Sequence, residues 1–159
     1  MPCIEALGKL DADPNQAMKD GATPMYIASQ VGHVPCIEAL GKLGADPNQA
    51  MKNGSTPMYI ASENGHVPCI DALGKLGADP NQATKDGWPP LAAAAHMKHP
   101  ECVAKLVEWG ADTQASVPGG RTAREFCVSK GGAEMQRALA RGEAERRARE
   151  ANEVGDVQR

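Results

Sequence analysis

Aromatic side chains are scarce in this chain of 159 residues: one Phe, two Tyr and two Trp make up 3% of it. A core built around large rings is therefore excluded, and small aliphatic contacts between helices are favoured. The chain has no run of 18 apolar residues, so the sequence predicts no membrane insertion. The formal net charge is only −3, which gives no general attraction to nucleic acid or to anionic lipid.

Motifs of the common catalytic sites are also missing. The sequence contains no Gly-rich phosphate loop, no H-E-x-x-H and no G-x-S-x-G. Most of its Cys and His residues recur with a fixed period, which is typical of structural positions. We therefore expect no catalytic residue, no cofactor and no small-molecule substrate.

Cysteine spacing is regular, because Cys3, Cys36, Cys69 and Cys102 follow one another at intervals of 33 residues. In successive packed layers such residues would lie roughly 8 to 10 Å apart, whereas a disulfide needs Cα atoms within about 7 Å. We expect free thiols and an intracellular, reducing compartment, the cytoplasm. The segment after Met1 also lacks the basic and apolar stretches of a secretory signal.

Three histidines, His33, His66 and His99, each precede a cysteine by three residues. A zinc site needs three or four converging ligands, and each unit of this period supplies only two. We therefore expect no metal site.

The dominant feature is an internal repeat of 33 residues. Residues 20–52 and 53–85 differ at only six positions of 33, and residues 86–118 form a more diverged copy. Residues 1–19 match the second half of the unit, and residues 119–141 match its beginning. The sequence thus predicts one repeat domain over 1–141, with a half repeat at 1–19 and a C-terminal cap at 119–141, followed by a charged tail at 142–159 that is helical or frayed.

Each unit is predicted to contain a turn and two short helices. Thr23 can cap a first helix that begins with Pro24 and continues from Met25 to about Val31. Pro35 is expected to open a second helix, which Gly44 closes. Neither helix is long enough to be stable alone, so the units must stack.

The repeated hexapeptide then carries a resemblance. Residues 23–28 and 56–61 both read T-P-M-Y-I-A, which is similar to the T-P-L-H-x-A signature of the ankyrin repeat, with Tyr in place of His. The resemblance covers residues 1–141. It implies an all-α ankyrin-repeat solenoid of stacked helix-turn-helix units joined by β-turn or hairpin-like loops. It also implies that the chain binds another protein through its turns and first helices.

In near-identical copies the positions that vary are the informative ones, so we expect the partner to contact them and their neighbours. Trp88 is the first choice, because aromatic side chains dominate interfaces, although it could instead pack over the adjacent turn of its own chain. The full set of candidate partner-binding residues is Trp88, Lys85, Asp86, His96, Met97, Arg121, Lys52, Asn53, Ser55, Glu63 and Asn64. The expected function is a non-catalytic adaptor or scaffold.

Two features leave alternatives open. Gly8, Gly41 and Gly74 lie within predicted second helices, which indicates either close helix approach or sequence drift that softens the solenoid, and we favour drift. The N-terminal half repeat lacks a first helix, so the chain could be a fragment, or a fixed subunit of a larger assembly that docks through this end or through the tail. The tail interleaves Arg with Glu, which favours a solvated, fraying helix over a nucleic-acid site.

Overall fold

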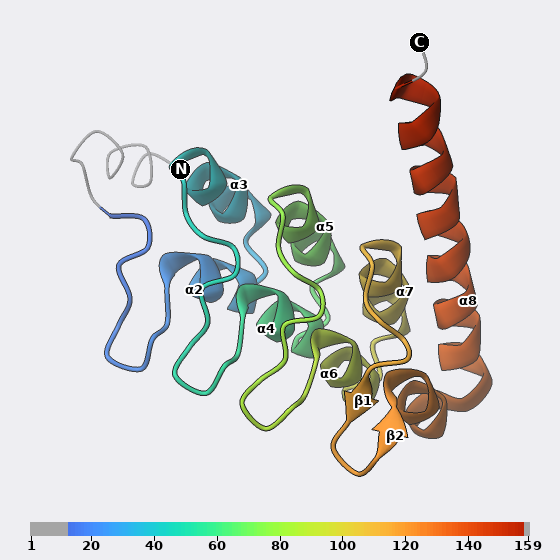
Figure 1. The fold of residues 1–159 in the computed structure, drawn as a ribbon. Coiled ribbons are helices and arrows are strands. Elements are labelled where there is room, and N and C mark those ends of the chain that lie inside the picture. The colour runs from blue at the N-terminus through green and yellow to red at the C-terminus, as the bar shows by residue number, and fades with distance from the viewer. Residues whose placement is uncertain (1–12, 158–159) are drawn as a thin grey trace.

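The computed structural model describes residues 13–157, which form two rows of helices. One row, the inner row, contains α2 (Pro24–Gln30), α4 (Pro57–Glu63) and α6 (Pro90–His96); the outer row contains α3 (Val34–Lys42), α5 (Val67–Lys75) and α7 (Pro100–Glu108). A hairpin of β1 (Ser116–Val117) and β2 (Arg121–Thr122) leads into α8 (Ala123–Val157). Figure 1 shows the two rows and the loops that project from the inner one. The predicted all-α repeat solenoid is confirmed.

Local sequence starts each helix as expected, with small shifts. The Oγ1 atoms of Thr23 and Thr56 accept hydrogen bonds of 3.1 Å from the backbone N–H groups three residues later, which caps α2 and α4. The second helix begins at Val34 and not at Pro35, because His33 takes the N-cap position and its Nδ1 accepts from the Cys36 N–H at 3.2 Å. The predicted half repeat 1–19, with Gly8, lies largely outside the described residues.

Neighbouring units are joined by a ladder of asparagine side chains. Asn15, Asn48 and Asn81 each accept, through Oδ1, the backbone N–H of the aspartate 31 residues later at 2.7 Å. Histidine supplies a second link, since the Nε2 atoms of His66 and His99 lie 3.1 Å from backbone carbonyls of the preceding unit. These repeated polar contacts fix the register in which the apolar faces stack.

Two glycines of the outer row have a packing role, and the preference for sequence drift was wrong. A Cβ added at Gly41 would lie 2.5 Å from Leu76 Cδ2, and one added at Gly74 would lie 2.3 Å from Trp109 Cδ2. The glycines therefore receive a large side chain from the next unit. Close approach of neighbouring helices, the alternative to sequence drift, therefore explains these two glycines.

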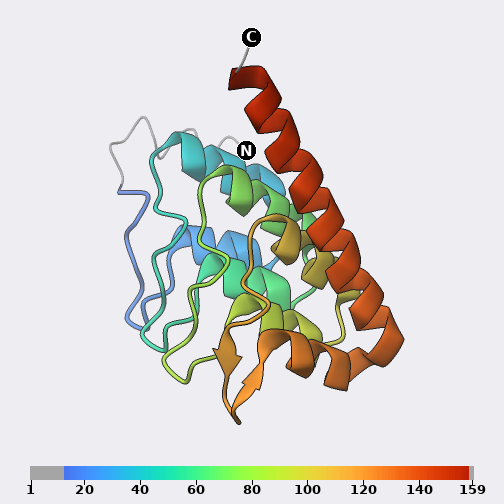
Figure 2. The same cartoon turned by 45° about the vertical axis from the view of Figure 1, so that its right-hand side comes forward.

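Helix α8 changes direction at Gly132, whose backbone (φ 52°, ψ −131°) is not helical. Its first segment extends the inner row, and its second segment packs across α7 (Figure 2). Met135, Ala138, Leu139 and Gly142 form the buried face of the second segment. Residues 142–157 of the predicted tail thus continue this helix, and the boundary after Arg141 stays a prediction.

Polar contacts also attach α8 to the stack. Arg141 pairs with Glu101 of α7 at 2.5 Å, and the guanidinium carbon of Arg149 lies 4.2 Å from the centroid of the Trp109 ring. Between Pro24 and Val157, no helix is both long and apolar enough to span a bilayer.

Candidate functional site

A hollow opens on the inner row where α4, α6 and the first segment of α8 follow one another. Its volume is about 350 Å³. Aromatic side chains form its walls, two alanines form its floor, and charged or polar side chains stand at its rim. We call it the aromatic groove, and its lining residues are Tyr59, Trp88, Phe126, Ala92, Ala93, Glu63, His96 and Lys130.

Three of the five aromatic residues in the chain meet in this groove. The rings of Trp88 and Phe126 lie 5.2 Å apart between centroids and are tilted by 58°, a favourable arrangement for aromatic pairs. Trp88 is half-buried against the core, so the alternative in which it packs within its own chain applies to part of its surface. The rest of that surface lines the groove.

Electrostatics differ between the two ends of the groove. At the α4 end, burial raises the pKa of the Tyr59 hydroxyl above its ordinary value, and the nearby Glu63 carboxylate raises it further. At the α8 end, the Lys130 ammonium stands 5.2 Å from the centroid of the Phe126 ring, within the range of a cation–π contact.

The floor of the groove results from two substitutions within the repeat. Ala92 and Ala93 occupy the positions that Tyr26-Ile27 and Tyr59-Ile60 take in the earlier units. Replacing Tyr and Ile with alanine removes the side-chain volume that would fill this space. The groove therefore forms at the diverged unit, because Ala92 and Ala93 lie between Tyr59 of the preceding layer and Phe126 of the following one.

The structure brings together only some of the predicted site residues. Trp88, Glu63 and His96 line the aromatic groove, whereas Lys52, Asn53, Lys85 and Asp86 lie on exposed turns and Asn64, Met97 and Arg121 are exposed outside it. Ser55 is 3% exposed, so it lies beneath the surface and offers no free contact.

The sequence reasoning missed Tyr59, Ala92, Ala93, Phe126 and Lys130 as lining residues. A signal for the two alanines was present, since they differ from the Tyr-Ile pair of both earlier copies. The contribution of Phe126 and Lys130 depends on how α8 extends the inner row.

A larger apolar hollow of about 700 Å³ lies at the N-terminal end of the stack, over α2 and α3. Ile27 and Val31 of its lining are 39% and 64% exposed, and Leu43 is 37% exposed. Asp13 and Pro14 stand at its edge.

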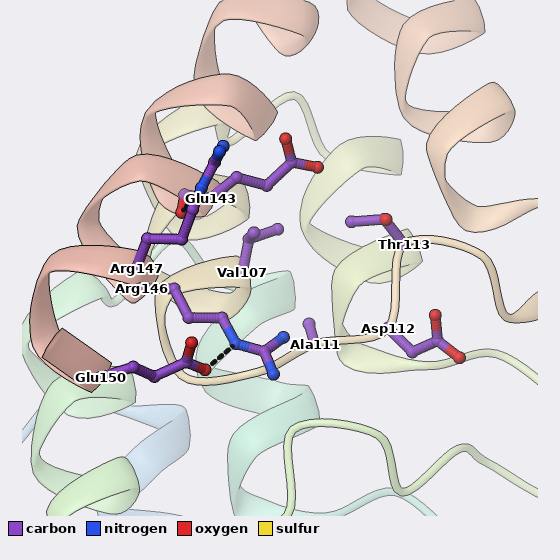
Figure 3. A pocket seen from close by; sticks show the side chains of 8 residues that line it. All are labelled: Val107, Ala111, Asp112, Thr113, Glu143, Arg146, Arg147 and Glu150. Carbon is purple, nitrogen blue, oxygen red and sulfur yellow. Dashed lines mark hydrogen bonds and ion pairs between the residues drawn. The ribbon is translucent and has the colours of Figure 1, made fainter. Parts of the chain in front are cut away.

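A third hollow, of about 370 Å³, lies between α8 and the loop after α7. Figure 3 shows Arg146 extending from α8 towards Ala111 while its Nε binds Glu150 at 2.8 Å. Glu143 of the same hollow pairs with Arg124 of the first segment. Both pairs lie within α8: the first joins successive turns of its second segment, and the second joins its two segments across the change of direction at Gly132.

Nucleophilic chemistry is not favoured at the buried thiols. Burial raises the pKa values of Cys102 and Cys127 to about 12, so both stay protonated at neutral pH. Across residues 13–157, no group of three or more His, Cys, Asp or Glu side chains is arranged to hold a metal ion.

Comparison with protein families agrees with this architecture. Residues 2–84 match a model of ankyrin repeats in three copies, and residues 86–116 match a model of the single ankyrin repeat. The chain belongs to the ankyrin-repeat family. Ankyrin repeats are generally protein–protein interaction modules and are typically non-catalytic. No curated protein matches the chain in sequence.

Proposed function

We propose that this protein is a non-catalytic adaptor or scaffold that binds another protein through the aromatic groove. The observation that carries the proposal is that three of the chain's five aromatic residues gather around an open, alanine-floored hollow. Aromatic side chains at the centre of an interface supply much of its binding energy. The exposed turns beside the groove, with Lys85 and Asp86, would form the outer part of the same interface.

The free thiols of Cys36, Cys69, Cys102 and Cys127 support the reducing compartment that the cysteine spacing predicts. The cytoplasm is accordingly part of the proposal.

A groove-filling variant tests the proposed site. Ala93→Ile introduces the residue that the chain itself carries at the equivalent positions, Ile27 and Ile60, so the fold should tolerate it. Ala148→Ile is the matched control, because Ala148 is exposed on the second segment of α8. All three proteins would be used for quantitative affinity capture from an extract of the source cells, after circular dichroism and urea unfolding have shown that they are folded.

We expect at least one protein to be captured by the wild type and by Ala148→Ile, and to be lost, by about tenfold or more, with Ala93→Ile. Capture that is equal for all three chains would remove the groove from the interface. Trp88→Ala is a poorer test than the sequence suggested, because loss of the Trp88–Phe126 pair also lowers stability.

The N-terminal hollow favours a second candidate function, in which the chain is a fixed subunit of a larger assembly. The occupant would be an apolar helix of the repeat type packing beside α2, in the place of the first helix that the predicted N-terminal half repeat lacks. The charged tail is disfavoured as the docking element, since its Arg146 and Glu143 are already paired within the chain. A partner lost with Val31→Lys but kept with Ala93→Ile would support this second function.

A further inference from the structure

The rim of the aromatic groove carries opposite charges on opposite sides. Glu63 lies at the end of α4, and Lys130 lies on the first segment of α8, with α6 and its His96 between them. Among residues 13–157, neither Glu63 nor Lys130 has an ion-pair partner within 4.0 Å. Both charges are therefore available to a ligand.

Each side of the groove favours a different ligand charge. The ammonium group of Lys130 lies against the Phe126 ring, so a cation of the ligand would be repelled there and an anion attracted. On the α4 side the Glu63 carboxylate raises the pKa of the Tyr59 hydroxyl, and a cation of the ligand would be attracted there. The floor between them is formed by Ala92 and Ala93, which offer only apolar surface and so suit an apolar side chain.

The distance between the helices of the inner row determines how far apart the two charged residues of a bound segment must lie. Adjacent packed helices lie roughly 8 to 10 Å apart, so the α4 and α8 sides are roughly 16 to 20 Å apart. An extended chain covers roughly 3.3 to 3.6 Å per residue, and every second side chain points to the same face. Charged residues two positions on either side of a central anchor are therefore separated by roughly 13 to 14 Å, and their long side chains cover the remainder.

We infer that the aromatic groove binds an extended segment of a partner protein in which a bulky apolar residue is flanked by a basic residue facing Glu63 and an acidic residue facing Lys130. This inference rests on the proposed function of the groove and specifies the chemistry of its partner. The orientation follows from the order of the layers, α4 before α8.

Four fluorescein-labelled peptides test the inference by fluorescence polarisation. All have the sequence Ser-Gly-X-Ser-Leu-Ser-Z-Ser-Gly, with a central leucine. Positions X and Z are Arg and Glu, both Glu, or both Arg. The fourth peptide has Glu at X and Arg at Z, so that either chain direction is sampled. The proteins are the wild type, Glu63→Lys, Lys130→Glu and Ala93→Ile.

For the wild type we expect an Arg/Glu peptide to bind about 3- to 10-fold more tightly than either uniformly charged peptide, an effect that weakens at high salt. Glu63→Lys should shift the preference to the peptide with two Glu, and Lys130→Glu should shift it to the peptide with two Arg. Ala93→Ile should weaken all of them.

Two results would overturn the inference. If binding depends on Ala93 but is equal for all charge patterns, the groove binds partners without this polarity, and the proposed function stands while the inference fails. If no peptide binds the wild type, the stated pattern is insufficient, and the capture experiment alone decides the proposed function.

Discussion

Gly74→Ala is the substitution that most directly tests how the outer row is packed. Gly74 lies in α5 beneath the Trp109 side chain of the next unit, and an added Cβ would lie 2.3 Å from Trp109 Cδ2 and 2.4 Å from Cε2. Contacts of this length between a Cβ and another heavy atom essentially never occur, so the ring or the helix must move. The ring has little freedom, since the Arg149 guanidinium carbon lies 4.2 Å from its centroid.

The magnitude follows from two opposing effects. Replacing glycine by alanine within a helix gains about 1 kcal/mol of helix propensity. Overpacking a well-filled site costs about 1 to 3 kcal/mol. The difference is a loss of about 0 to 2 kcal/mol. We expect the upper half of that range because an indole ring is rigid, so that Gly74→Ala lowers the free energy of unfolding by about 1 to 2 kcal/mol and the Tm by about 2 to 8 °C.

Urea unfolding followed by circular dichroism measures this change, with Gly41→Ala as the control. A Cβ at Gly41 would meet the methyl groups of Leu76 at 2.5 and 2.8 Å and its Cγ at 3.2 Å, and a leucine side chain can rotate away. We expect Gly41→Ala to be neutral or stabilising by up to about 1 kcal/mol. The double variant Gly74→Ala/Trp109→Leu places an alanine against a leucine, the same pair that Gly41→Ala makes with Leu76, and should recover most of the loss. Equal stabilisation by Gly74→Ala and Gly41→Ala would refute the close approach and restore sequence drift as the explanation.

Three further changes probe other contacts. Asn81→Ala removes the acceptor of the Asp112 N–H (2.7 Å) and should cost about 0.5 to 1.5 kcal/mol by urea unfolding, whereas Asn81→Asp, which keeps that acceptor, should lose less. Lys98 has φ 60° at a position where the earlier units have glycine, so Lys98→Gly should raise the Tm, and an unchanged or lower Tm would show that this conformation is not strained. Burial raises the pKa values of Cys102 and Cys127 to about 12, so the thiols of the unfolded chain lose their protons first as the pH rises above about 9. The free energy of unfolding should therefore fall between pH 9 and 12 by up to about 1.4 kcal/mol per pH unit for each thiol. A double Cys→Ala variant with an equally steep fall would contradict this.

The repeat made much of the architecture predictable. Two copies that differ at six positions of 33 must fold alike, and the Thr-Pro pair marks the start of each first helix by capping chemistry that is entirely local. The second helix of each unit begins one residue earlier than predicted, with a histidine at the N-cap position, a role that sequence propensity assigns weakly to histidine.

Contacts between units were harder to predict, because they depend on which side chains meet across layers. The pairing of Gly74 with Trp109 joins positions 35 residues apart, and nothing in either local sequence indicates it. The packing of α8 on α7 depends on the change of direction at Gly132, which turns a charged segment so that Met135 and Leu139 become buried. The charge spacing favoured a solvated helix only for the tail after Arg141, and residues 144–154 of that tail are mostly exposed.

Periodicity itself limits where a specific site can form. Units that are nearly identical present the same side chains at each layer, so a surface made only from them repeats the same features and gives a partner no unique register. The third unit and the cap break this pattern, with Ala92 and Ala93 on α6 and Phe126 and Lys130 on α8. Their junction is where small, aromatic and charged side chains of different layers combine into a single hollow. A partner that reads both the apolar floor and the opposite charges at the rim can therefore bind in only one register along the stack, which a uniform array of the first two units could not enforce.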